Sequence, residues 1–227
     1  MSVEIKYIDH SFFLISHDNC NVAIDPFIAG ETSSKNSLNS MKIDDILLTH
    51  AHGDHLGESI ELSKIKGTNI TGIFELANYC MRKGASARGI NMGGEISFPW
   101  GKAIWLPASH SSSTPDGQYA GSPASILVKI GNLSIYHAGD TGLHADMKMI
   151  GDYYKPDISL LTIGGYYTMG INEAVEAAKW LGSKKIIPMH YNTFPPIQAD
   201  PSEFKEKIEA KTEAECIILK PGEWYRT

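Results

Sequence analysis

The chain has 227 residues, of which 42% are hydrophobic and 20% charged, enough to bury one substantial globular core. Its formal net charge of −6 argues against a nucleic-acid partner, because such proteins need a positive face. The three cysteines are far apart and include no Cys-x-x-Cys pair, which excludes a disulfide framework and favours a reducing, cytoplasmic setting.

Strands dominate the first half of the chain. Short apolar segments predict strands at residues 3–8, 12–16, 22–24 and 46–48. The polar segment 31–40, rich in Ser and Asn, predicts an exposed loop. A helix is expected to open at residues 58–63, and a second has helical spacing over 73–83 and stops near Gly84. Residues 89–94 are interpreted as a turn.

Strands and helices alternate in the second half. The pattern predicts strands at residues 95–98, 102–106, 124–130, 133–136, 158–163, 186–189 and 215–219. Helices are predicted at residues 145–150, 172–181, with Asn172 as N-cap, and 201–211, with Pro early in its first turn. No run of about 18 apolar residues predicts a membrane span. Without a linker or a repeat, residues 1–227 are expected to form a single domain.

A histidine-rich motif, Thr49-His50-Ala51-His52-Gly53-Asp54-His55, follows the strand at 46–48. It holds three of the nine histidines of the chain. His50 and His52 would diverge on a helix, so a turn suits them better as joint ligands. Imidazole and carboxylate are ligands for a borderline divalent metal. The alternative is a solvated polar loop, which the concentration of histidines disfavours.

Three further polar residues also end apolar strands: His110, Asp140 and His190. Loops that leave strand ends meet at one edge of a sheet, where they can build a shared site. Together with the motif they supply five histidines and two aspartates. That set is too large for one tetrahedral ion and suits two ions that share a carboxylate.

The order of these residues, His50-x-His52-x-Asp54-His55 followed by His110, Asp140 and His190, resembles the metallo-β-lactamase superfamily. Within it, the stretches 136–142 and 188–194 are most similar to small metal-dependent hydrolases related to L-ascorbate-6-phosphate lactonase. The resemblance implies an α/β (α+β) fold: an αββα four-layer sandwich of two mixed β-sheets with helices on the outer faces.

The resemblance also implies a ligand set for two divalent ions. By position, His50, His52 and His110 hold the first metal, Asp54, His55 and His190 hold the second, and Asp140 bridges them. Asp54, Asp140 and His190 are the candidate catalytic residues. Zinc suits these donors best, with manganese, iron and nickel as alternatives. Many secreted lactamases place a cysteine at the second metal, and this chain has none near any ligand.

The expected chemistry is hydrolysis of a small molecule by a hydroxide that bridges the two metals. Two divalent ions outweigh the charges of Asp54, Asp140 and hydroxide, so an anionic substrate is favoured. Lys and Arg are scarce around the motifs, which favours a small ester, lactone or phosphate-containing metabolite. The alternative is a phosphodiesterase or nuclease of the same superfamily, and a small cyclic nucleotide is a further possible substrate.

Six residues are weaker candidates for a supporting or substrate-binding role. His10 and Asp25 could fix a ligand by a hydrogen bond, or be satisfied turn residues. Asn91 could donate to a developing oxyanion, although turn formation explains it equally well. Arg88, three residues before Asn91, is the candidate cation for an anionic substrate. The remaining two, Thr168 and Met169, lie in a Gly-rich loop that also carries Tyr166 and Tyr167 and could form a pocket wall or a lid.

Other classes fit the sequence less well. Di-iron oxidoreductases of this fold usually carry an acidic residue at the position of His52 and an added flavin domain, and neither is seen. Glutathione-thioester hydrolases usually add a C-terminal helical region, whereas about 37 residues follow His190 here. Binding without catalysis is disfavoured by the full ligand set. A homo-oligomer is expected.

Overall fold

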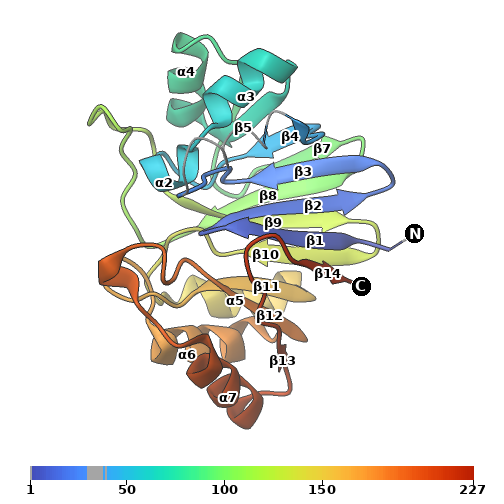
Figure 1. The fold of residues 1–227 in the computed structure, drawn as a ribbon, viewed down its shortest axis with the longest axis vertical. Coiled ribbons are helices and arrows are strands. Elements are labelled where there is room, and N and C mark those ends of the chain that lie inside the picture. The colour runs from blue at the N-terminus through green and yellow to red at the C-terminus, as the bar shows by residue number, and fades with distance from the viewer. Residues whose placement is uncertain (1, 30–37, 39) are drawn as a thin grey trace. The chain divides into compact units, whose positions relative to one another are not determined.

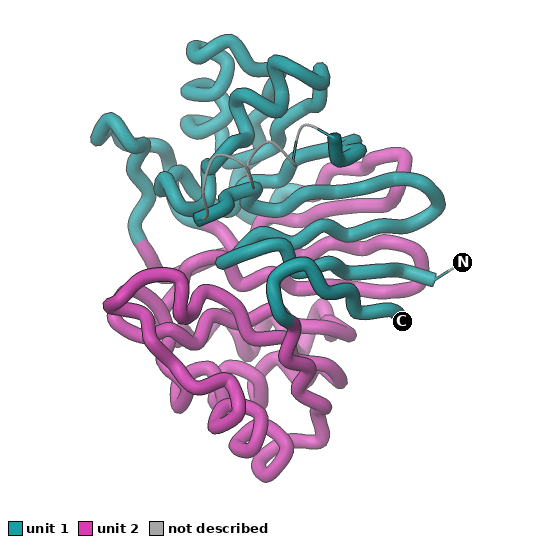
Figure 2. The backbone as a smooth tube through the Cα atoms, viewed as in Figure 1, with its two compact units in different colours: residues 1–94, 111–123, 220–227 teal, residues 95–110, 124–219 magenta. Residues whose placement is uncertain are grey.

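The computed structural model describes residues 2–29, 38 and 40–227, so the loop predicted at 31–40 lies mostly outside the described residues. The chain divides into two compact units, unit 1 (residues 1–94, 111–123 and 220–227) and unit 2 (residues 95–110 and 124–219) (Figure 2). The single domain expected from the sequence therefore stays a prediction. Within the described part of the chain, no helix has the length and apolar character needed to cross a membrane.

Unit 1 is built on a seven-stranded mixed sheet (Figure 1). Its order across the sheet is β14 (Trp224–Arg226), β1 (Glu4–Asp9), β2 (Phe12–His17), β3 (Cys20–Ile24), β4 (Asp45–Leu47), β5 (Asn69–Ile73) and β6 (Ala87–Ile90). β1 to β3 form an antiparallel meander, and the pairs β3–β4, β4–β5 and β5–β6 are parallel. The last strand, β14, pairs antiparallel with β1, with Ile5 opposite Tyr225.

The helices of unit 1 are α2 (Gly53–Leu56), α3 (Ser59–Lys66) and α4 (Phe74–Arg82). α3 packs on β5, and α4 packs on β5 and β6. On α4 the buried residues Leu76, Ala77 and Cys80 recur at helical spacing, which turns one face of the helix inward. Leu76 and Cys80 join one buried apolar cluster with strand residues such as Ala23 and Ile46. The strand ends are thereby held on a rigid core.

Unit 2 has a second seven-stranded mixed sheet. Its order is β13 (Glu215–Cys216), β12 (Lys185–Met189), β11 (Ile158–Thr162), β10 (Leu133–His137), β9 (Ala124–Ile130), β8 (Gly101–Pro107) and β7 (Glu95–Phe98). β7 to β10 are antiparallel, and β10 to β13 are parallel. Parallel neighbours carry their loops out at the same edge, so the loops that follow β10, β11 and β12 leave the sheet together.

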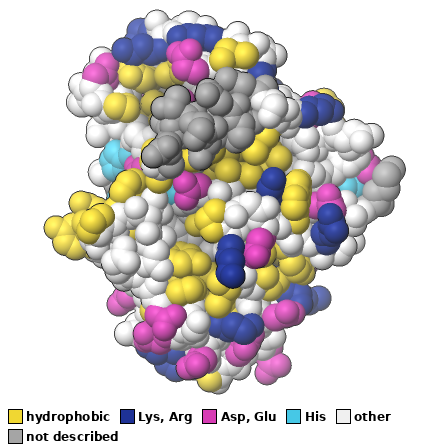
Figure 3. Space-filling view, in the orientation of Figure 1, with side chains coloured by type: hydrophobic (Ala, Val, Ile, Leu, Met, Phe, Trp, Pro, Cys, Tyr) yellow, Lys and Arg dark blue, Asp and Glu magenta, His cyan; other side chains and the backbone are white. Residues whose placement is uncertain are grey.

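The helices of unit 2 are α5 (Asp146–Tyr154), α6 (Ile171–Leu181) and α7 (Pro201–Lys211), with a short 3₁₀ turn η1 (Pro195–Ile197). α6 packs against α5, α7 and β11. Asp200 caps α7 by accepting the Ser202 N–H at 2.8 Å. Acidic and basic side chains are mixed on the surface over α6 and α7 (Figure 3), where Lys205 pairs with Glu209 at 2.7 Å.

Some predicted elements differ from the structure. α6 begins at Ile171 with Gly170 as N-cap, and Asn172 instead accepts a hydrogen bond from Lys207 Nζ at 2.9 Å. Residues 89–90 belong to β6 rather than to a turn, since they pair with β5. The strand predicted at 215–219 ends at Cys216. β5 and β14 lack a strong local signal and are set by pairing with distant segments.

Candidate metal centre

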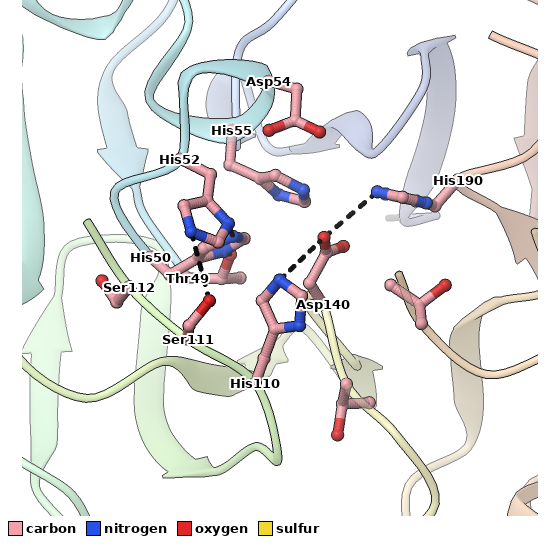
Figure 4. Close-up of polar contacts among 12 residues, drawn as sticks. Thr49, His50, His52, Asp54, His55, His110, Ser111, Ser112, Asp140 and His190 are labelled. Carbon is pink, nitrogen blue, oxygen red and sulfur yellow. Dashed lines mark hydrogen bonds and ion pairs between the residues drawn. The ribbon is translucent and has the colours of Figure 1, made fainter. Parts of the chain in front are cut away.

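The ligand motif of unit 1 lies where β4 leads into α2. His50 and His52 are on the connecting turn, and Asp54 and His55 are in α2 (Figure 4). The carbonyl of His52 accepts the backbone N–H groups of His55 and Leu56 at 3.0 and 2.8 Å, which starts the helix at the motif. His50 and His55 are buried, and His52 and Asp54 are partly exposed. Two of the four candidate metal ligands in the motif, His52 and Asp54, therefore remain accessible to solvent.

His50 and His52 direct ring nitrogens at each other. His50 Nε2 lies 3.0 Å from His52 Nδ1, and the rings are nearly perpendicular at 80°. Two nitrogens that bind one tetrahedral zinc at about 2.0–2.1 Å are roughly 3.3 Å apart. The observed spacing is therefore close to that of two ligands of the same ion.

Asp25 fixes the ring orientation of His55. Its Oδ2 lies 2.7 Å from His55 Nδ1, and both side chains are fully buried. Because a carboxylate only accepts hydrogen bonds, the proton of this imidazole is on Nδ1 and the lone pair is on Nε2. A partner on the other ring nitrogen is the usual support of a metal-binding histidine. Asp25 thus has the geometry expected of a supporting residue.

Thr49 extends the same arrangement to His50. Its hydroxyl donates to Asp25 Oδ2 at 2.6 Å and lies 3.0 Å from His50 Nδ1. The hydroxyl has a single proton, which is given to Asp25, so it accepts from His50 Nδ1–H. The lone pair of His50 is therefore on Nε2, the atom that faces His52. One buried carboxylate sets two imidazole tautomers, directly for His55 and through Thr49 for His50.

Two further contacts complete the set in unit 1. His10 is fully buried, has φ 48°, and places its Nε2 3.2 Å from Asp54 Oδ2. One ligand atom from each of His10, Asp54 and His55 lies within 4.8 Å of the others. Ser111 Oγ lies 3.4 Å from His52 Nε2, which leaves His52 Nδ1 for the metal side (Figure 4).

Unit 2 gathers His110, Asp140 and His190 from the ends of β8, β10 and β12 (Figure 4). Asp140 Oδ2 lies 3.5 Å from His110 Nε2 and 3.1 Å from His190 Nε2. Asp140 and His190 are buried, and the side chain of His110 is 13% exposed. One carboxylate oxygen thus lies between two imidazoles.

The loops that carry His110 and Asp140 are tied together. Ser109 N–H donates to Thr141 Oγ1 at 2.9 Å, and Gly142 N–H donates to the Ser109 carbonyl at 3.0 Å. Gly139 has φ 60°, and its N–H donates to His137 Nδ1 at 3.1 Å. These bonds fix the backbone on both sides of Asp140, so little rearrangement is left for the carboxylate.

The weaker candidates have clear positions. Arg88 is on β6 and donates from Nε to Thr71 Oγ1 at 3.1 Å. Asn91 is exposed and closes its own turn, accepting Met92 N–H at 2.9 Å and Gly94 N–H at the same distance. Met169 is buried, whereas Thr168 beside it is partly exposed. The turn interpretation explains Asn91 without an oxyanion role.

Buried cysteines take no part in either ligand set. Burial raises the pKa of the Cys80 thiol to about 12 and that of the Cys216 thiol to about 12. Both stay protonated at neutral pH and behave as small apolar side chains. The candidate metal ligands on each unit are imidazoles and carboxylates, and in unit 1 the tautomers of His50 and His55 are set by Thr49 and Asp25. These groups fit a divalent metal ion.

Sequence reasoning missed Thr49, Ser111 and Thr141. Each is a polar residue directly next to a candidate ligand. Polar residues flanking a ligand at a strand end are a usable signal for such partners. Which of them contacts what depends on segments distant in the chain, such as Asp25 for Thr49.

Comparison with known proteins gives one consistent result. A family model described as Beta-lactamase superfamily domain matches residues 4–190. A UPF0173 metal-dependent hydrolase of Thermus thermophilus is 44% identical over 224 residues, or 99% of each chain. Another from Staphylothermus marinus is 46% identical over 228 residues and 97% of each chain.

A solved structure is also similar over the whole chain. It is that of Igni18, a metallo hydrolase from Ignicoccus hospitalis, with a TM-score of 0.91 and 38% sequence identity, covering 100% of this chain and 99% of that one. The predicted α/β class, with two mixed β-sheets and helices, is confirmed.

Proposed function

The chain belongs to the β-lactamase superfamily, among relatives named metal-dependent hydrolases, and on that premise we propose that it hydrolyses a small molecule with two divalent metal ions. The proposed ligands are His50, His52 and His110 for the first ion, Asp54, His55 and His190 for the second, and Asp140 for both. Zinc suits five imidazoles and two carboxylates, with manganese, iron and nickel as alternatives.

The observation that carries the proposal is the position of Asp140. Its Oδ2 contacts His110, a proposed ligand of the first ion, and His190, a proposed ligand of the second. A carboxylate that binds two ions must lie between the ligands of the first ion and those of the second. The fixed tautomers of His50 and His55 support the same assignment, because each imidazole keeps a lone pair on Nε2 with which it can bind a metal ion.

Two metal ions supply an activated water and an electrophile for the substrate oxygen. The chain's own residues hold and orient these groups. Asp54 is proposed first as a ligand and orienting group, and His10 holds its Oδ2 at 3.2 Å. Proton acceptance by Asp54 is a second proposed role, which its partial exposure allows. Asp140 is buried and held by two imidazoles, which suits it to positioning rather than proton transfer.

The proposed substrate is a small anionic ester, lactone or phosphate-containing metabolite. Arg88, the candidate cation beside the Asn91 turn, donates a hydrogen bond to Thr71. The metals are then the main positive groups for the substrate, which suits one carboxylate or phosphate better than a polyanion. A cytoplasmic location is part of the proposal, since the cysteine pattern favours a reducing compartment.

The test combines metal content with a substrate panel. Wild type, Asp140→Asn and the control His17→Ala are measured by elemental analysis and assayed on a lactone, a phosphodiester, a thioester and a β-lactam. His17 is far in sequence from every proposed ligand and pairs with the exposed Asp18 at 3.3 Å. We expect two ions per chain and one hydrolysed class for wild type and His17→Ala.

Asp140→Asn should lose at least one ion and roughly 100-fold or more in kcat/KM. Replacing a residue that binds the metal directly should reduce activity more than replacing a residue that only supports a ligand. Turnover of the phosphodiester alone would favour the phosphodiesterase alternative. Trace metal that added zinc or manganese does not restore, with no turnover, would exclude the binuclear hydrolase.

A further inference from the structure

The loop between β11 and α6 leaves unit 2 beside its candidate ligands. β11 lies between β10 and β12 and is parallel to both. β10 leads into Asp140 and β12 leads into His190, whose side chains are 3.1 Å apart. The intervening loop, residues 163–170, carries neither ligand. It is the segment that enters this edge of the sheet between the two ligand-bearing strands.

Both ends of this loop are anchored next to the ligands. Met169 N–H donates to the carbonyl of Thr141, the residue after Asp140, at 2.9 Å. A Cβ at Gly164 would collide with the His190 carbonyl oxygen and lie 2.8 Å from Ile197 Cβ, so only glycine fits there. The loop therefore packs directly on the backbone that carries His190.

Two tyrosines project from the anchored loop. Tyr166 is 80% exposed and Tyr167 is 55% exposed, and their rings meet edge to face with centroids 4.6 Å apart. Tyr166 has φ 53°, in the left-handed region that bulky side chains rarely adopt. Exposed rings gain little from folding, and a strained backbone opposes it, so neither feature stabilises unit 2.

We propose that Tyr166 and Tyr167 are the substrate-specificity residues of the site and bind a flat ring. The substrate class is then an ester or phosphate that carries an aryl or heteroaryl group. This inference rests on the proposed function, because metal ions at Asp140 and His190 must hold the hydrolysed end. Two rings at 79° offer an incoming ring one face for stacking and one edge, and their hydroxyls can hydrogen-bond ring heteroatoms.

The experiment compares two probes that share a headgroup and differ in the ring. Phenylphosphonate and methylphosphonate are titrated calorimetrically into the zinc-loaded full-length protein. The variants are the double change Tyr166→Ser with Tyr167→Ser, and the control Tyr153→Ser. Tyr153 is 76% exposed and also has a tyrosine partner, but it lies on α5, which leads to the opposite end of β11.

Wild type and Tyr153→Ser should bind phenylphosphonate about threefold to tenfold more tightly than methylphosphonate, the range expected for one aromatic contact. The double variant should lose this preference and keep its Kd for methylphosphonate. A preference that survives in the double variant, or is absent in wild type, would overturn the inference while leaving the hydrolase proposal intact. Failure of both probes to bind zinc-loaded wild type, with no turnover in the panel, would overturn both proposals.

Discussion

Asp25 is the residue that orients the candidate metal ligands of unit 1. It accepts hydrogen bonds from Thr49 N–H at 2.9 Å, from the Thr49 hydroxyl and from His55 Nδ1–H, and it is fully buried at φ 49°. A buried carboxylate with several donors is stable only while these partners stay in place. Its strained backbone is consistent with a functional position.

Changing Asp25 to Asn should lower zinc affinity roughly 10-fold to 100-fold, the usual cost of losing the partner of a metal-binding histidine. The amide has one oxygen, so it cannot accept from Thr49 N–H at Oδ1 and from the Thr49 hydroxyl and His55 Nδ1–H at Oδ2 together, and its uncharged oxygen is a weaker acceptor for the imidazole. Competition with a chromophoric zinc chelator measures the change.

Asp18→Asn is the matched control for Asp25→Asn. Asp18 also has φ 49°, but its side chain is 46% exposed, so the same substitution is made in the same backbone conformation away from buried histidines. Its zinc affinity should equal that of wild type. Equal affinities in all three proteins would show that Asp25 does not support the ligands.

Thiol reactivity tests the burial of the cysteines. Cys80 and Cys216 are buried with a thiol pKa of about 12 each, whereas Cys20 is partly exposed. Because the thiolate is the reactive form, these two thiols should stay inert at pH 8. We expect one fast equivalent with a disulfide reagent in the folded protein and three after denaturation; three fast equivalents in the folded protein would contradict the fold.

At the scale of elements, close helix packing explains one glycine of unit 2. Gly151 is in the middle of α5, where α5 contacts α6. A Cβ there would collide with the Trp180 carbonyl oxygen and lie 2.8 Å from Leu181 Cα. Since both neighbours are backbone of α6, the added methyl group cannot be accommodated by a change of rotamer.

Gly151→Ala should therefore destabilise the protein by about 1–3 kcal/mol, the usual cost of overpacking. Helix propensity alone predicts the opposite sign, a gain of up to about 1 kcal/mol. Urea unfolding decides between them, with Met149→Ala on the same helix as control. Met149 is 48% exposed, so Met149→Ala should change the free energy of unfolding by no more than about 0.5 kcal/mol beyond the effect of helix propensity. A stabilised Gly151→Ala would disprove the close packing.

At the scale of the whole molecule, the proposed ligands come from four strand ends spread over residues 50–190. Residues this far apart in the chain could share an ion only after folding, so the proposed metal binding would be linked to folding. In the unfolded chain only the motif at 50–55 keeps several donors together. The metal should accordingly stabilise the native state as a whole.

Removal of metal by a chelator should lower Tm, and a 100-fold excess of zinc over Kd should restore it. That excess contributes about 2.7 kcal/mol, which is roughly 5–10 °C for a chain of this size. Differential scanning calorimetry measures the shift, with the double variant His50→Ala and His52→Ala as the comparison. A Tm that does not respond to zinc in wild type would contradict the linkage.

The sequence by itself determined the residue types of the candidate site and most of the elements that carry them. Three of the nine histidines follow one apolar strand, and His110, Asp140 and His190 follow others, so local chemistry and strand pattern were sufficient. The family and the α/β class followed from the same residues, because the order of the candidate ligands along the chain is typical of the family.

Only the tertiary structure decided how the donors are held. The Asp25 contacts to Thr49 and His55 join residues 24 and 30 positions apart, and the His10 contact to Asp54 spans 44. β14 became a strand through pairing with β1 at the other end of the chain. Hydrogen-bond partners and strand pairs are chosen by long-range packing, which local propensity does not encode.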